Sequence, residues 1–288
     1  MGNNVISKDY IEGELKKYKV PGIGIGVIKD GKVIFKEGFG FKNLAKESLV
    51  TPLTQFGIAS CTKSFTSALI GMLADDGYFG LEQPIKEYLP DFEMYDSVAT
   101  AECTLKDMLT HNTGLGGHDA LWVDNITRAE LWKRLRYLEP NKPFRSTVQY
   151  NNLIYTIAGH IAEKVTGKTW DKLIEERIFK PLEMNNSNTS ITKMVLSKDF
   201  ATPYWQSKSG PFEIDNWNVD LGGPAASINS CVEDMLKWLQ FHIDEGVTQS
   251  KNGKEGKRLI KKETLNEMHK TQVPYTLWPW DFDELPPT

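Results

Sequence analysis

The sequence predicts an α+β fold in which an antiparallel sheet is flanked by helices and carries an inserted helical lobe. Short strand patterns come first along the chain, amphipathic helical patterns fill the middle, and further helical patterns follow. We therefore expect an N-terminal helix and hairpin at residues 1–57, a mainly helical lobe at 58–190, and a return toward the sheet at 191–288.

The first element expected is an amphipathic helix at residues 7–20. Its spacing places Ile11, Leu15 and Tyr18 on one inward face, and Pro21 ends the pattern.

A β-hairpin is expected next, at residues 23–39. Isoleucine and valine alternate with Gly24 and Gly26, and Asp30-Gly31 supplies a tight turn before an apolar return strand. A strand face made of glycine would let a helix pack closely against it.

Residues 60–182 have a mainly helical pattern. Thr104 and Thr127 each precede an acidic residue by three positions, which is the spacing of a helix N-terminal cap, and Gly167 marks a helix end. A later helix is expected from Ser230, with Glu233 completing its cap, and a last one at residues 263–269.

The predicted sheet has too few strands. A two-stranded hairpin is only marginally stable alone, and no partner strands for residues 23–39 are recognisable later in the chain. We therefore expect a domain that lacks its C-terminal strands.

Composition excludes several classes of function. The formal net charge is −4 with acidic and basic residues interspersed, so we expect no nucleic-acid partner. No signal peptide or long apolar span is recognisable, which predicts a cytoplasmic protein without a membrane partner.

Three isolated cysteines favour a reducing compartment over a disulfide framework. The five histidines have no metal-ligand spacing, so we expect neither a metal nor another cofactor.

Ser60 and Lys63 form a Ser-x-x-Lys quartet where a short apolar stretch gives way to a helical pattern. Side chains three apart share one helix face, so the Lys63 amine can approach the Ser60 hydroxyl and act as its base once burial lowers the lysine pKa. A serine cap beside a solvated lysine is the alternative interpretation.

The spacing alone is weak, because about one or two such pairs are expected by chance in this composition. The second copy, Ser190 with Lys193, lies in a polar run without a preceding strand, and we interpret it as coincidence.

Tyr150 and Asn152 form a second constellation, where a loop meets another helical pattern. A phenol can relay protons and an amide can anchor a substrate amide. An asparagine cap beside a packed tyrosine is the alternative.

Together the two motifs resemble the serine beta-lactamase and penicillin-binding-protein superfamily, especially its branch of class C beta-lactamases, D-aminopeptidases and esterases. The stretch at 105–115, which ends in His-x-x-Gly-Leu, and the segments at 155–167 and 222–238 extend the resemblance over about residues 10–270. It implies a beta-lactamase/transpeptidase-like fold.

By this resemblance Ser60 is the acylated nucleophile, Lys63 its base, Tyr150 the proton relay to the leaving group and Asn152 a substrate anchor. His111 falls in a family stretch that is better interpreted as a structural turn than as a catalytic base.

One family motif is absent, namely the Lys-Thr-Gly or His-x-Gly that lies on a later strand. Lys168-Thr169 is followed by Trp170, and no histidine has glycine two positions on. In the family that strand supplies an oxyanion donor, and the loss of one donor typically costs about 10²–10³ in kcat.

The leading hypothesis is a serine hydrolase that forms an acyl-enzyme with a small-molecule or peptide substrate: a beta-lactam, a D-amino-acid peptide or an ester. The alternative is a non-catalytic binding or structural relative, because the third motif is absent. Chance motifs would instead leave Ser60 and Tyr150 far apart. The oligomeric state cannot be predicted from the sequence. The large aromatic residues Trp122, Trp205 and Trp217 are candidates to line a cleft.

Overall fold

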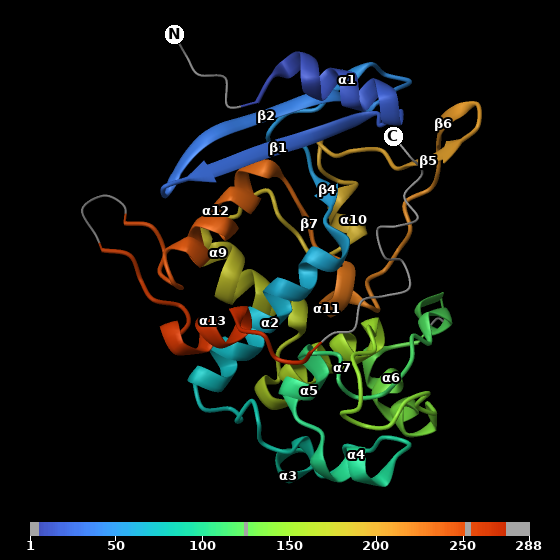
Figure 1. The fold of residues 1–288 in the computed structure, drawn as a ribbon, viewed down its shortest axis with the longest axis vertical. Helices are drawn as coiled ribbons and strands as arrows, with labels where there is room; N and C mark the ends of the chain where they lie inside the picture. Colours follow the sequence, from blue (N-terminus) through green and yellow to red (C-terminus); the bar gives the residue numbers. More distant parts are fainter. Residues whose placement is uncertain (1–5, 124–125, 251–254, 275–288) are drawn as a thin grey trace.

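The computed structural model describes residues 6–123, 126–250 and 255–274, and it has a mixed α+β fold (Figure 1). A three-stranded antiparallel sheet lies at one end, with strands in the order β1-β2-β3. Its strands are β1 (Gly22–Lys29), β2 (Lys32–Asn43) and β3 (Ser48–Leu49). Two small antiparallel pairs join β4 (Phe56–Gly57) to β7 (Asn229–Ser230) and β5 (Tyr204–Ser207) to β6 (Gly210–Glu213).

Helices make up most of the remaining structure. The α-helices are α1 (Lys8–Tyr18), α2 (Thr62–Asp75), α3 (Ile85–Tyr88), α4 (Ser97–Glu102), α5 (Leu105–Leu109), α6 (Arg128–Arg134), α7 (Asn152–Thr166), α8 (Trp170–Ile174), α9 (Lys180–Leu182), α10 (Ile191–Met194), α11 (Gly223–Ala226), α12 (Val232–Ile243) and α13 (Lys262–His269). Shorter turns are the 3-10 helices η1 (Ala59–Cys61), η2 (Asp119–Val123) and η3 (Leu135–Tyr137), and the π-helix η4 (Glu175–Phe179).

The β1–β2 hairpin is confirmed. Asp30 and Gly31 have φ values of 50° and 69°, as a two-residue turn between twisted strands requires. The glycine face is also confirmed as a packing surface, because a Cβ on Gly24 would lie 2.5 Å from Val232 Cγ2 of α12. Figure 1 shows α12 directly beneath the hairpin.

Helix α2 occupies the centre of the core and packs against α7, α11 and α13. Phe65 and Leu69 of α2 and Ile157 of α7 are completely buried, and the Phe65 ring stacks on Trp238 with centroids 4.0 Å apart. This packing brings the starts of α2 and α7, which carry the two motifs, next to each other.

Most predicted helix ends are confirmed. Thr104 and Thr127 form complete capping boxes, and Gly167 ends α7 in the left-handed conformation. The cap predicted at Ser230 was wrong, because Ser230 belongs to β7 and Glu233 instead bonds Lys36 at 2.8 Å, which leaves α12 without a side-chain cap.

Tyr18 was also predicted wrongly as inward facing: it is 60% exposed, since α1 covers the sheet with little more than Ile11.

Within the part of the chain that the structure describes, β1 pairs with β2 alone. The expected lack of C-terminal strands stays a prediction. None of the described helices is long and apolar enough to cross a bilayer.

Candidate active site

Ser60 lies in η1, the 3-10 turn that leads directly into α2, and its side chain is exposed. The residue before it, Ala59, has a φ of +45°, a conformation that non-glycine residues adopt only when the surroundings impose it. The sequence placed Ser60 in the first α-helical turn, whereas α2 begins two residues later, at Thr62.

Lys63 lies in the first turn of α2 and is only 8% exposed. Its Nζ is 3.1 Å from Ser60 Oγ, 2.8 Å from Asn152 Oδ1 and 3.0 Å from the carbonyl oxygen of Ala225. Three hydrogen-bond partners from three distant segments therefore surround one amine.

The chemistry of these partners orients the amine. The Asn152 and Ala225 oxygens are carbonyl oxygens, which can only accept hydrogen bonds. In the structure Lys63 Nζ donates to Ser60 Oγ as well as to the two carbonyl oxygens, which matches the three N–H groups of an ammonium. A neutral amine has two N–H groups and one lone pair, so it could keep both carbonyl bonds and accept from the Ser60 hydroxyl. In that neutral form the amine would face the proton of Ser60 as a general base does.

Burial also favours the neutral amine. It is the largest influence on the Lys63 pKa and lowers that pKa below its ordinary value near 10.5, while the nearby Tyr150 hydroxyl and the charge of Asp119 act in the opposite direction.

Tyr150 comes from the loop before α7, and its Oη lies 2.6 Å from Ser60 Oγ. The Lys63 amine is 4.7 Å from the centre of the Tyr150 ring, and the Tyr150 residue is 38% exposed. A substrate that reaches Ser60 would therefore also meet this phenol.

Asn151 fixes the loop that carries Tyr150. Its side chain caps α7 by accepting from Ile154 N at 2.9 Å and donates to the carbonyls of Leu115 and Gly116. Its own N–H donates to His111 Nδ1 at 3.1 Å.

His111 acts as a neutral acceptor in this loop. Burial, assisted by the charge of Lys63, lowers the pKa of His111 to about 4, so its Nδ1 remains free to accept the Asn151 bond at neutral pH. The His111 ring also contacts the Tyr150 ring, with centroids 4.6 Å apart.

All four residues proposed from the sequence therefore lie together: Ser60, Lys63, Tyr150 and Asn152. Sequence reasoning missed Ala225, because a backbone carbonyl leaves no side-chain signal. It also did not give a role to Asp119, whose carboxylate accepts from Asn152 Nδ2 at 3.2 Å and so fixes which Asn152 atom faces Lys63.

A cavity of about 430 Å³ is lined by Ala59 and Ala226, the chain neighbours of Ser60 and Ala225, and by apolar side chains that include Phe41, Ile214 and Trp217. The four candidate side chains are not among its lining residues. Trp205 is not among the residues that line it, and the Trp122 side chain lies outside the described residues. Among the residues that the structure describes, no three histidine, cysteine or carboxylate side chains gather as a metal would require.

Comparison with known proteins agrees with this fold. The model of the Beta-lactamase family matches residues 8–286. The chain is 32% identical over 242 residues to "Unguisins hydrolase ungD" of Aspergillus violaceofuscus, which covers 78% of this chain and 42% of that protein. It is 29% identical over 247 residues to "Protein flp" of Staphylococcus aureus, which covers 81% of this chain and 48% of that protein.

Two solved structures share the fold. A penicillin-binding protein homologue from Pyrococcus abyssi, described as octameric, superposes with a TM-score of 0.76 and 26% identity, covering 95% of this chain and 61% of that one. FmtA from Staphylococcus aureus superposes with a TM-score of 0.74 and 20% identity, covering 90% of this chain and 68% of that one.

The chain belongs to the beta-lactamase family, whose members are generally serine hydrolases. The beta-lactamase/transpeptidase-like fold is thereby confirmed. The chain spans less than half the length of the two curated relatives described above.

Proposed function

We propose that this chain is a serine hydrolase that forms an acyl-enzyme on Ser60 with an amide or ester. The observation that carries the proposal is the position of Lys63 Nζ, which lies within hydrogen-bonding distance of Ser60 Oγ and of two carbonyl oxygens. The similarity to a relative named as a hydrolase supports the same reaction class.

In the acylation step Lys63 Nζ takes the Ser60 proton while Oγ attacks the substrate carbonyl carbon. The Ser60 backbone N–H stabilises the oxyanion of the tetrahedral intermediate. The bond to the leaving group then breaks, and Tyr150 Oη donates a proton to that group and recovers one from Lys63. The products are the acylated Ser60 and the protonated leaving group.

In the second step water attacks the acyl carbonyl carbon. One water proton returns to Ser60 Oγ through Lys63 and Tyr150, and the free acid departs. Asn152 anchors the substrate amide through its side chain.

The test is covalent labelling with a fluorophosphonate serine probe and mass spectrometry. We expect mass addition at Ser60 that is lost in Ser60→Ala and falls at least about 100-fold in Lys63→Ala. Lys193→Ala is the matched control because Lys193 belongs to the second Ser-x-x-Lys copy, and it should label like the wild type. A well-folded wild-type chain without labelling would refute the proposal.

A second candidate is a non-catalytic relative that uses the same fold for binding. The absence of a Lys-Thr-Gly or His-x-Gly motif from the sequence favours it. It predicts that the beta-lactam and ester substrates bind without covalent addition, which intact-protein mass spectrometry distinguishes from acylation.

A further inference from the structure

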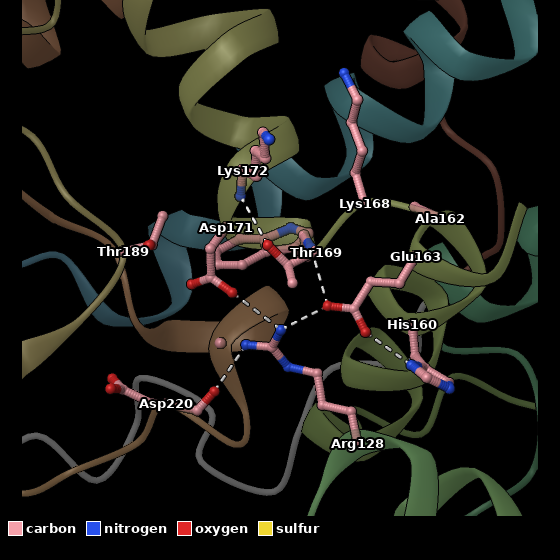
Figure 2. Close-up of polar contacts among 12 residues, drawn as sticks. Arg128, His160, Ala162, Glu163, Lys168, Thr169, Asp171, Lys172, Thr189 and Asp220 are labelled. Carbon is pink, nitrogen blue, oxygen red and sulfur yellow. Dashed lines mark hydrogen bonds and ion pairs between the residues drawn. The ribbon is translucent and has the colours of Figure 1, made fainter. Parts of the chain in front are cut away.

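Arg128 is a partly buried arginine that joins four segments of the chain outside the candidate active site. It occupies the first position of α6, and its side chain is 14% exposed. Its Nη1 lies 2.8 Å from Glu163 of α7 and 3.2 Å from Asp171 of α8 (Figure 2).

The other guanidinium atoms hold a loop. Nη2 donates to the carbonyl of Asp220 at 2.8 Å and Nε to the carbonyl of Leu221 at 3.1 Å. Figure 2 shows the guanidinium between the two carboxylates and this loop. A Cβ on Gly223 would lie 2.3 Å from Nη2, so a larger residue there would displace the guanidinium from this position.

The held loop leads directly into α11, which has four residues and no side-chain cap. So short a helix has little stability of its own, and its position depends on what anchors it. Helix α11 presents two carbonyls to α2: that of Pro224 accepts from Thr66 Oγ1 at 2.6 Å, and that of Ala225 accepts from Lys63 Nζ at 3.0 Å.

We propose that Arg128 is a positioning residue that keeps the Ala225 carbonyl on Lys63 and so keeps the amine aimed at Ser60. This inference rests on the proposed role of Lys63 as a base. A lysine at position 128 cannot replace the arginine, because one ammonium group cannot reproduce a planar fork that reaches two carboxylates and two carbonyls at once.

If α11 were released from its anchor, the effect on Lys63 would come from water that enters the site. Water would reach Nζ and replace the Ala225 carbonyl, which relieves the burial that favours the neutral amine. The ionisable groups that face Lys63 are elsewhere: Cys61 in η1, Tyr150 and Tyr155 at α7, Asp119 in η2 and His111 after α5. Helix α11 contributes no ionisable side chain, so its effect on Lys63 is that of the carbonyl and the exclusion of water.

The experiment compares wild type, Arg128→Lys and Gly223→Ala. The Lys63 pKa is measured by ¹³C NMR, with the signal assigned by Lys63→Arg, and the rate of fluorophosphonate labelling is measured from pH 5 to pH 10. In both variants we expect the Lys63 pKa and the acidic limb of the labelling profile to move up by about one pH unit. The labelling rate at pH 7 should then fall about tenfold, with partial recovery at high pH.

Arg177→Lys is the matched control. Arg177 also pairs with a carboxylate, that of Asp76 at 2.7 Å, but lies outside the described contacts of Lys63. Arg177→Lys should lower thermal stability slightly and leave the Lys63 pKa and the acidic limb of the labelling profile unchanged. A purely structural role for Arg128 would lower the folded fraction at every pH without moving the limb.

Folded Arg128→Lys and Gly223→Ala proteins with the wild-type Lys63 pKa would overturn the inference. If Arg128→Lys does not fold, Gly223→Ala decides alone, since it displaces the guanidinium without removing it. Absence of labelling in the wild type would instead refute the proposed hydrolase, and the NMR titration would still decide the role of Arg128.

Discussion

The reactivity proposed for Ser60 depends on which atoms surround a single amine. Lys63 donates to two carbonyl oxygens that cannot donate in return, so once the amine is neutral its lone pair would be left for Ser60 Oγ. Asp119 fixes the same geometry from outside, because it accepts from Asn152 Nδ2 and so turns Asn152 Oδ1 toward Lys63.

Tyr150 gives the sharpest prediction for a single residue. Removal of its hydroxyl removes the proton donor for the leaving group, which matters only when the leaving group needs a proton. Tyr150→Phe should therefore slow acylation about 10²- to 10⁴-fold with poorly activated esters or amides, and less than about tenfold with nitrophenyl esters. Burst kinetics with a series of phenyl esters of increasing leaving-group pKa measures this dependence.

Tyr155→Phe is the matched control for that series. Tyr155 is buried, and its Oη donates to the carbonyl of Leu109 at 2.8 Å. Its loss should lower the free energy of unfolding by about 1–2 kcal/mol without any dependence on the leaving group. Equal losses across the series in Tyr150→Phe would remove the relay role from Tyr150.

At the scale of elements, the starts of α2 and α7 hold the residues of the candidate site, and β1 provides the glycine face on which α12 packs. The sequence predicted these elements where local rules determine them, as at the Asp30-Gly31 turn and the Thr104 and Thr127 caps. It failed at Ser230, where pairing with Phe56 in the β4–β7 ladder took the residue into a strand. Such a tertiary contact has no local signature.

The contact between β1 and α12 gives a prediction about stability. Val232 is β-branched and cannot rotate its Cγ2 away easily, so the methyl group of Gly24→Ala would overpack the interface. We expect a loss of about 1–3 kcal/mol in the free energy of unfolding, measured by urea denaturation.

Two further variants serve as controls for the Gly24→Ala result. Gly13→Ala lies in α1 with nothing within 4 Å of its new Cβ, and it should stabilise the protein by up to about 1 kcal/mol. Val232→Ala should recover part of the loss when combined with Gly24→Ala, since it removes the clashing methyl. If Gly24→Ala proves as stable as the wild type, the packing account of the glycine face is wrong.

For the whole molecule, the candidate site is assembled from residues 60–63, 150–152 and 225, which only the tertiary structure brings together. The four side chains could be identified from the resemblance to a known family, because they recur there as short motifs. That resemblance could not reveal the Ala225 carbonyl or the Arg128 network behind it, since these depend on how α11 is anchored rather than on a local pattern.

Two half-buried histidines should make the stability of the whole chain depend on pH. Burial lowers the pKa of both His111 and His242 to about 4, with the charges of Lys63 and His269 respectively adding to the effect. In the unfolded chain the pKa of a histidine is about 6.5. Between about pH 6.5 and 4 the unfolded state therefore binds more protons than the folded state, and stability is lost as the pH falls.

Each histidine should contribute a slope of up to about 1.4 kcal/mol per pH unit within that window, and the slope should end below about pH 4. His111→Asn isolates one of the two contributions: asparagine tolerates the φ of 58° at this position, and its side-chain oxygen can accept from the Asn151 N–H. Urea denaturation between pH 7 and pH 4.5 should show about half the wild-type slope in His111→Asn, and again in His242→Asn. A wild-type slope in His111→Asn would mean that His111 is protonated in the folded chain, and the Asn151 N–H would then need another acceptor to hold Tyr150 in place.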